Sequence, residues 1–108
     1  MISADAIRGY VDLMVLSLLR ERPSYAYELS QHITARAGYT IKQTTLYSAV
    51  KRLESTGLVS SYAASSDSGK PRIYYEITPR GSDHFAQKVA EWRDTKAVVD
   101  RFVEGTEE

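Results

Sequence analysis

A short segment of the chain, residues 40–59, carries the side chains best suited to contact a polar ligand. On a helix its apolar residues share one face, while hydroxyls, an amide and cations occupy the opposite face and its flanks. Hydroxyls and amides can hydrogen-bond to base edges in the major groove of DNA, and Lys and Arg hold phosphates. The alternative is an ordinary solvated helix. The candidate contacts with a duplex in and beside this segment are Lys42, Gln43, Thr44, Tyr47, Ser48, Lys51 and Arg52.

Groups that could support catalysis are sparse. The chain has no cysteine and two histidines, His32 and His84. Neither a glycine-rich phosphate loop nor a carboxylate–His–carboxylate set is present. Asp83 adjoins His84, but neighbouring residues of a helix do not face each other, and His32 is expected to be solvated. The sequence therefore predicts no enzyme, no metal site and no cofactor.

The charge of the chain is zero overall but unevenly distributed. Residues 36–80 carry seven cations against three anions, whereas residues 1–35 carry three against four and residues 81–108 carry four against seven. The affinity of a surface for a polyanion depends on the local field rather than on the total charge. The middle of the chain is therefore where a nucleic-acid partner is expected.

Length and composition describe a single small domain. A chain of 108 residues that is 43% hydrophobic can fold alone, yet it is small enough to gain stability from a partner subunit. No apolar run reaches the roughly 20 residues of a membrane span, and Asp5, Arg8 and Asp12 interrupt any secretory signal. The absence of cysteine is compatible with a reducing compartment. We therefore expect a cytoplasmic protein with no membrane partner.

Three helices are expected before the first strand. Residues 5–21 repeat apolar side chains at helical spacing, in a stripe broad enough for burial on two sides. Ser24 is a credible N-cap for a second helix that ends by Gly38. The third helix lacks a good cap, since Lys42 occupies the N-cap position, so we expect a frayed or shifted start. Gly57 should close this helix in a left-handed conformation. The apolar face of this third helix is Leu46, Ala49, Val50 and Leu53.

Two extended runs, residues 58–63 and 72–78, flank a polar turn. They predict a β-hairpin whose tip projects into solvent. Its cations, Lys70 and Arg72, could lie along a phosphate backbone or in a minor groove. A loop that only adds solubility is the alternative.

A long helix is predicted after the hairpin, with Thr78 as its cap and Pro79 at its first position. The pattern continues to about Val103, which is roughly 25 residues or about 37 Å. Because the preceding helices are too short to cover it, we expect a dimerisation helix; a helix folded back over the first one is the alternative. Its seam, which one lysine interrupts, is Phe85, Val89, Trp92, Lys96, Val99 and Val103.

Together these elements predict a mainly α fold with a small β-hairpin. Three helices and a two-stranded wing make a winged helix-turn-helix DNA-binding domain over residues 1–78. A C-terminal dimerisation helix and a tail follow over residues 79–108. Function is therefore expected to reside in the third helix and the wing.

Several short motifs stand in the order and spacing of a known family. They are Tyr25-Ala-Tyr-Glu-Leu29, Thr45-Leu-Tyr47, Lys51-Arg-Leu-Glu54, Gly57-Leu-Val59, Arg72-Ile-Tyr-Tyr75 and Ile77-Thr-Pro-Arg-Gly81. Over about residues 7–103 the chain resembles the PadR family of bacterial transcriptional regulators. Its length and single C-terminal helix resemble the short PadR subtype, which has multidrug-binding members. The resemblance implies a homodimeric repressor that responds to small molecules.

The resemblance also implies roles for individual residues. Thr45 and Tyr47 match the start of the family's recognition helix, which implies contact with the DNA backbone or bases. Lys51 and Arg52 match its basic pair. Of the tyrosines in the second helix, the resemblance implies a phosphate contact for Tyr27 and packing for Tyr25.

The wing and two departures complete the comparison with the family. Lys70 and Arg72 match the cations of its wing. Ser48 stands where the family usually has Pro, which adds a hydroxyl to the reading face. Ala26 stands where Gly is common. Both departures bear on the operator sequence rather than on the fold.

A flat apolar effector is expected to bind beside the tryptophan of the seam. Two copies of Trp92 across a dimer axis could line a slot, and Lys96 would place a cation at its mouth, so neutral or anionic compounds are preferred. The alternative is that Trp92 only packs the dimer interface. The candidate effector-binding residues are Trp92, Lys96, Val11 and Val15.

The expected function is that of a sequence-specific DNA-binding transcriptional regulator, a homodimeric repressor relieved by a small molecule. A dimer would set its two third helices about 34 Å apart, so that each enters a successive major groove of an inverted repeat of double-stranded DNA. The alternative is a winged-helix module that mediates protein contacts and does not bind DNA. A cationic third helix together with a cationic wing favours DNA, because a protein-interaction module needs neither.

Overall fold

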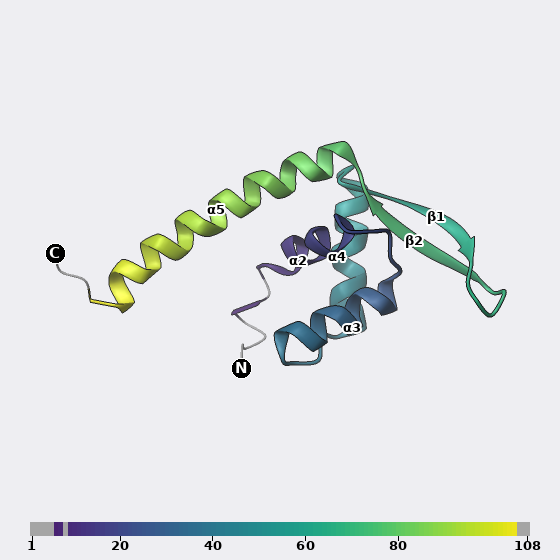
Figure 1. Cartoon of the computed structure of the whole chain (residues 1–108), viewed down its shortest axis with the longest axis horizontal. Coiled ribbons are helices and arrows are strands. Elements are labelled where there is room, and N and C mark those ends of the chain that lie inside the picture. Colours follow the sequence, from purple (N-terminus) through teal and green to yellow (C-terminus); the bar gives the residue numbers. More distant parts are fainter. Residues whose placement is uncertain (1–5, 8, 106–108) are drawn as a thin grey trace.

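The computed structural model describes residues 6, 7 and 9–105. Its elements in chain order are α2 (Val11–Leu19), α3 (Ala26–Ala37), α4 (Gln43–Ser55), β1 (Val59–Ser65), β2 (Pro71–Ile77) and α5 (Pro79–Val103). The helices α2, α3 and α4 gather below α5, and the hairpin β1–β2 extends away from them (Figure 1). This arrangement confirms the predicted mainly α fold with a small β-hairpin.

The helix predicted over residues 5–21 is shorter than expected. α2 begins only at Val11, after a turn at Gly9 and Tyr10 in which the Tyr10 N–H donates to the Ile7 carbonyl at 2.8 Å. Glycine is a poor helix former, which accounts for the interruption. The start that the pattern placed at residue 5 lies outside the described residues.

The core lies where α2, α3 and α4 meet. The predicted apolar face of α4 is confirmed, since all its members are buried, and Val59 and Tyr75 of the hairpin extend the same cluster. Full burial of one such side chain contributes about 1.5–3 kcal/mol. Burial of α2 on two sides is also confirmed, because α2 packs against α4 as well as against α5. The largest fully buried side chains are Leu16, Leu29, Leu46, Leu53, Val15 and Val50.

The start of α3 differs from the sequence prediction. Ser24 is not the N-cap: that position belongs to Tyr25, which makes no capping bond through its side chain. The backbone of Ser24 instead pairs with Tyr75 of β2, donating to its carbonyl at 3.1 Å and accepting from its N–H at 2.8 Å. The Ser24 hydroxyl donates to the carboxylate of Glu28 in the first turn. The predicted end is confirmed, since Gly38 closes α3 with φ 77°.

The C-terminal end of α4 agrees with the prediction, whereas its start is not shifted, because α4 begins at Gln43 directly after Lys42. Lys42 is its N-cap residue and makes no side-chain cap bond. At the other end Gly57 has φ 80°, a left-handed conformation that favours glycine. The Leu58 N–H reaches back to the Leu53 carbonyl at 2.9 Å, which satisfies one of the last free carbonyls of the helix. The chain thus leaves α4 and enters β1 in a fixed direction.

The wing is an antiparallel pair in which Val59 lies opposite Ile77 and Ser65 lies opposite Pro71. β1 ends two residues later than expected and β2 begins one residue earlier, because pairing continues to the tip of the hairpin. On the other edge of β2, the bridge from Ser24 adds a short third segment. The hairpin is therefore attached both to the end of α4 and to the start of α3.

The start of α5 is confirmed as predicted. The Thr78 Oγ1 accepts a hydrogen bond from the Gly81 N–H at 3.0 Å, with Pro79 at the first helical position. The Thr78 hydroxyl also donates to the Gly57 carbonyl at 2.8 Å. Gly81 is buried, because its backbone lies directly against the carbonyl of Leu58. The root of α5 is thereby packed onto the junction between α4 and β1.

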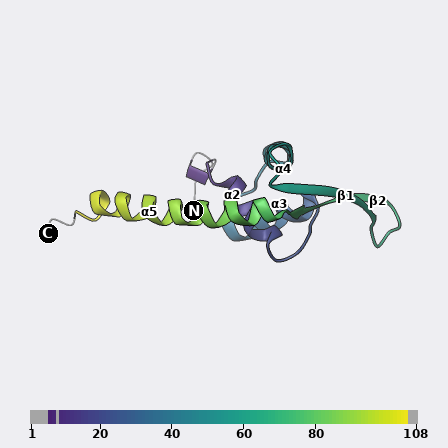
Figure 2. The ribbon, with the colours of Figure 1, turned by 90° about the horizontal axis from the view of Figure 1, so that it is seen from above.

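The first half of α5 covers α2, and its second half runs on alone (Figure 2). Trp92 meets Tyr10 edge to face at a centroid distance of 5.1 Å, and the Arg20 guanidinium lies 4.7 Å from the Phe85 ring centroid. The chain measures 60 × 29 × 20 Å, and its radius of gyration of 15.9 Å exceeds the about 13 Å of a compact domain of this length. Among the described helices, none combines the length and apolarity needed to cross a membrane.

Candidate nucleic-acid interface

The polar face of α4 is exposed as predicted. The residues that face away from the core are called the α4 outer face here, and each of them is exposed. The first turn of α4 contains no acidic residue. No carboxylate there would repel a phosphate placed near the positive end of the helix dipole. The α4 outer face comprises Lys42, Gln43, Thr44, Thr45, Tyr47, Ser48, Lys51 and Arg52.

One member of this face is held by α3. The Gln43 Nε2 donates to the Ser30 Oγ at 2.6 Å, and the Ser30 hydroxyl donates to the Tyr27 carbonyl at 2.7 Å. The Tyr27 side chain is 57% exposed, and its hydroxyl accepts from the Gln31 amide at 3.0 Å. Sequence reasoning missed the link between Gln43 and Ser30, because no local pattern pairs residues thirteen positions apart.

Lys51 belongs to a cluster that joins α4 to the wing. Its ammonium lies 3.0 Å from a Glu54 carboxylate oxygen and 5.7 Å from the ring centroid of Tyr47. The other Glu54 oxygen accepts a hydrogen bond from the Ser61 hydroxyl of β1. The bond from Ser61, and then that from Lys51, hold the pKa of Glu54 below its ordinary value; the bond to Glu54 raises the pKa of Lys51.

The depressed pKa of Glu54 predicts a pH-dependent contribution to stability. A carboxyl with a lowered folded-state pKa stabilises the fold above its unfolded pKa of about 4.3, and this contribution is lost as the pH falls through the folded value. We expect Glu54→Gln to lower the free energy of unfolding at pH 7 by less than about 1 kcal/mol, since the cluster is exposed. Urea denaturation of the wild type and the variant at pH 7 and pH 3 measures this loss of stability, with Glu76→Gln on β2 as control. A difference of equal size at both pH values would contradict this role.

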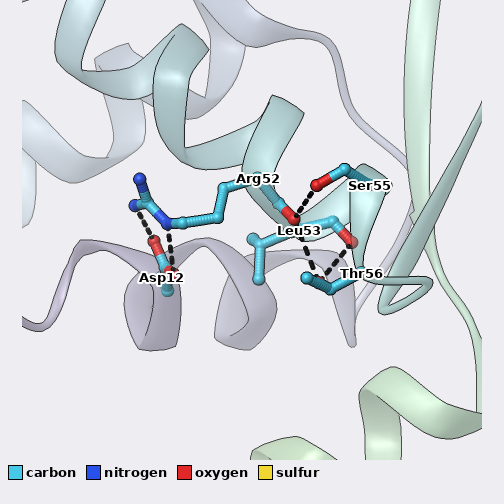
Figure 3. Close-up of polar contacts among 5 residues, drawn as sticks. All are labelled: Asp12, Arg52, Leu53, Ser55 and Thr56. Atoms are coloured by element: carbon cyan, nitrogen blue, oxygen red, sulfur yellow. Dashed lines mark hydrogen bonds and ion pairs between the residues drawn. The ribbon is translucent and has the colours of Figure 1, made fainter.

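Arg52 ties α4 to α2 (Figure 3). Its Nε lies 3.1 Å and its Nη2 2.5 Å from the two carboxylate oxygens of Asp12, forty residues away in the chain. The hydrogen bond to Asp12 raises the pKa of Arg52. The Arg52 carbonyl accepts from the hydroxyls of Ser55 and Thr56 at the end of the helix. Arg52 is thus exposed, but its guanidinium already has an anionic partner on α2.

The two wing cations have different surroundings. Lys70 is exposed at the tip of the hairpin. The Arg72 guanidinium instead lies 3.9 Å from the ring centroid of Tyr25, and a side-chain hydrogen bond with Tyr74 is the main reason that its pKa is raised. Tyr74 meets Tyr25 edge to face and stacks on Tyr62 with 5.8 Å between centroids. This cluster fastens the hairpin to the start of α3.

The seam of α5 divides into a covered and an uncovered part. Phe85, Val89 and Trp92 line an apolar groove of about 550 Å³ between α2, the end of α3 and α5. Val99 and Val103 are 49% and 72% exposed. The first half of α5 therefore folds back over α2, as the alternative in the sequence analysis had it. The second half of α5 keeps an apolar face that no other part of the described chain covers. Val98 and Phe102, which the sequence analysis did not include, widen this face.

Only Trp92 of the predicted effector-binding residues lies in the groove. Val11 and Val15 face the core, at 2% and 0% exposure, because α2 turns them toward α3 and α4. Lys96 pairs with Asp100 at 3.2 Å, beyond the end of the groove. Arg36 of α3 supplies a cation to the groove wall in its place. Among the described residues, no three His, Asp or Glu side chains gather in a way that could hold a metal ion.

The fold and the exposed α4 define a winged helix-turn-helix protein. The chain belongs to the PadR-like family of transcriptional regulators, whose family model matches residues 15–87. It is 38% identical over 109 residues to an uncharacterized protein of Lysinibacillus sphaericus, a match that covers 99% of this chain and 100% of that protein.

Solved structures share both the fold and much of the sequence. A transcriptional regulator from Clostridium thermocellum is 48% identical with a TM-score of 0.85, covering 95% of this chain and 99% of that one. A PadR family transcription regulator from Clostridium difficile R20291 is 35% identical with a TM-score of 0.80, covering 87% and 98%. The likeness therefore extends through the long C-terminal helix as well as the winged domain.

Proposed function

We propose that this chain is a sequence-specific DNA-binding regulator in the cytoplasm, a homodimeric repressor that a small-molecule effector releases from its operator. The observation that carries the proposal is the α4 outer face. It presents hydroxyls, an amide and cations on the helix that enters the major groove in helix-turn-helix proteins. The family of transcriptional regulators to which the chain belongs supports it.

The exposed groups divide by the part of the duplex that each can contact. Thr44, Thr45 and Ser48 carry short hydroxyls on the middle of the outer face, suited to base edges or nearby phosphates. Tyr47 lies beside these hydroxyls and can contact the sugar–phosphate backbone of the DNA. The longer cations and Tyr27 suit phosphates, which fix position but carry no sequence information. The proposed phosphate contacts are Tyr27, Lys42, Lys51 and Lys70.

Arg52 and Arg72 are proposed to act differently from the lysines. Each is held by other side chains, Arg52 by Asp12 and Arg72 by Tyr25. They add to the local positive field, and they position α4 and the wing. Direct contact with a phosphate would require Arg52 to leave its carboxylate partner.

A homodimer is proposed because the second half of α5 leaves its apolar seam uncovered. Val99 and Val103 are exposed on a helix that extends well beyond the domain (Figure 1). A second copy would bury them. An isologous dimer repeats the α4 outer face about a twofold axis, and the two faces then match an inverted repeat when they stand about 34 Å apart.

The proposed effector is a planar, apolar, neutral or anionic molecule bound in the groove beside Trp92. The groove is lined mostly by apolar side chains and has a volume suited to a small ligand. Phe85 and Tyr10 add aromatic surface, and Arg36 disfavours cationic compounds. Binding there would shift the arrangement of α2 against α5, and with it the spacing of the two α4 helices.

Salt dependence tests the DNA-binding proposal. Lys70→Ala should weaken binding by a similar factor for every duplex and reduce the slope of log K against log salt by about one for each wing in contact, since only a phosphate contact is removed. Fluorescence anisotropy of a labelled duplex between 50 and 200 mM salt measures this. Lys88→Ala is the control, because Lys88 lies on α5 and pairs with Glu91. If the wild type bound no duplex at low salt, the protein-interaction alternative would stand.

A further inference from the structure

We infer that Ser30 fixes the side-chain amide of Gln43 so that this residue reads an amino-bearing base, adenine or cytosine, through its carbonyl oxygen. The inference rests on the proposed binding of α4 in the major groove. It adds a specificity determinant, and a positioning residue behind it, to that binding. Neither role follows from the exposure of Gln43 alone.

The direction of the amide follows from the hydrogen bonds of Ser30. A serine hydroxyl has one hydrogen, and the hydroxyl of Ser30 directs it to the Tyr27 carbonyl at 2.7 Å, which can only accept. The atom of Gln43 that lies 2.6 Å from the Ser30 Oγ must then be a donor, so it is the amide nitrogen. The opposite orientation would place two acceptors against each other.

Ser30 is a rigid support for this contact. Its side chain belongs to the middle of α3 and is only 4% exposed. Both of its hydrogen bonds are short and link it to separate elements, α3 and α4. Gln43 itself is exposed, at the first residue of α4. One Nε2 hydrogen is thus used on the protein side, and the Oε1 and the second Nε2 hydrogen remain for an outside partner.

An outward acceptor distinguishes bases in the major groove. Adenine and cytosine present an amino group there, whereas guanine presents two acceptors and thymine presents one together with a methyl group. The Gln43 Oε1 can therefore accept from adenine N6 or cytosine N4. Adenine is favoured, because the second amide hydrogen can also reach its N7. Guanine could accept from the second amide hydrogen but would place its other acceptor against the Oε1, and thymine would leave the Oε1 without a donor.

The neighbouring hydroxyls cannot make the same distinction. Thr44, Thr45 and Ser48 each rotate to donate or accept, and no described side-chain bond orients any of them. Their contacts suit any base or a phosphate. Gln43 is therefore the reader on this face with a preset polarity, and Ser30 is the residue that presets it.

Selection from a random duplex library with the purified full-length chain tests the inference. The wild type should enrich adenine, and secondarily cytosine, roughly ten- to a hundredfold at one position in each half-site. Gln43→Ala should abolish enrichment at that position. Ser30→Ala should reduce it by about tenfold while the affinity for the selected site and its salt slope stay nearly unchanged, because no phosphate contact is lost.

A second variant guards against a general defect in folding. Gln43→Glu keeps the length of the side chain and offers only acceptors, so it should move the preference toward cytosine. Thermal unfolding of Ser30→Ala checks that the fold persists. If Ser30→Ala kept the wild-type base preference, or if the wild type selected guanine or thymine at the position that Gln43→Ala relaxes, the inference would be overturned while DNA binding stood. A wild type that bound no duplex at low salt would remove the proposed function, and the inference with it.

Discussion

Replacing Gly81 with alanine is expected to lower the free energy of unfolding by about 3 kcal/mol, the upper range for overpacking a filled site. A Cβ at this position would lie 2.0 Å from the Leu58 carbonyl oxygen and 2.7 Å from the Ile77 Cγ1. The oxygen cannot move freely, because it accepts from the Thr78 N–H at 3.1 Å. Urea denaturation followed by far-UV circular dichroism measures the loss.

Gly9→Ala is the matched control for Gly81→Ala. A Cβ on Gly9 would meet nothing within 4 Å, so the change should alter stability by no more than about 0.5 kcal/mol. Equal stability of the two variants would show that the root of α5 does not press against the Leu58 backbone in solution. The position of α5 over α2 would then need revision as well.

The double variant Val99→Asp, Val103→Asp is expected to dissociate the proposed dimer. Operator binding should then weaken by at least about a hundredfold, because the second half-site is no longer bound intramolecularly. Both side chains are exposed in the single chain, so the fold should survive their replacement. In a dimer they would bury charge without a partner, which is strongly unfavourable. Sedimentation measures the assembly, and anisotropy measures the affinity.

The control for this pair places the same charge elsewhere on α5. Ala90 and Ala97 are exposed on the side of the helix opposite the seam. The double variant Ala90→Asp, Ala97→Asp should remain dimeric and bind DNA with nearly wild-type affinity. If both double variants stayed dimeric, the seam of α5 would not be the interface, and another surface would have to join the subunits.

Local signals in the sequence were sufficient for most of the fold. Thr78 and Pro79 start α5 as predicted, and Gly38 and Gly57 end α3 and α4 in left-handed conformations. Each depends on the residue itself and a few neighbours, so the pattern contains the information. The α4 outer face was also predictable, because helical periodicity separates buried from exposed positions.

Contacts between distant residues were beyond such reasoning. Ser24 pairs with β2 instead of capping α3, because Tyr75 lies beside it in the fold. The ion pair of Arg52 with Asp12 crosses the helix interface, and no local pattern joins residues forty positions apart. The orientation of Gln43 is likewise decided by a residue of another helix.

Periodicity also could not assign the sides of a helix that is buried in two directions. α2 carries apolar residues toward both the core and the groove, and its spacing does not say which residues face which. Val11 and Val15 were therefore placed at the effector site although they belong to the core. Leu13 and Met14, one helical face away, line the groove instead.

The bridge between Ser24 and Tyr75 has a consequence for the proposed response to an effector. It joins the hairpin to the start of α3, while Asp12 and Arg52 join α2 to α4, so we expect these elements to move together as one body. A molecule between α2 and α5 is then expected to tilt that body as a whole rather than to redirect the hairpin by itself. Such a tilt would change the distance between the two α4 helices of the proposed dimer. The effector should therefore change whether the protein prefers an operator with or without an inserted base pair between its half-sites.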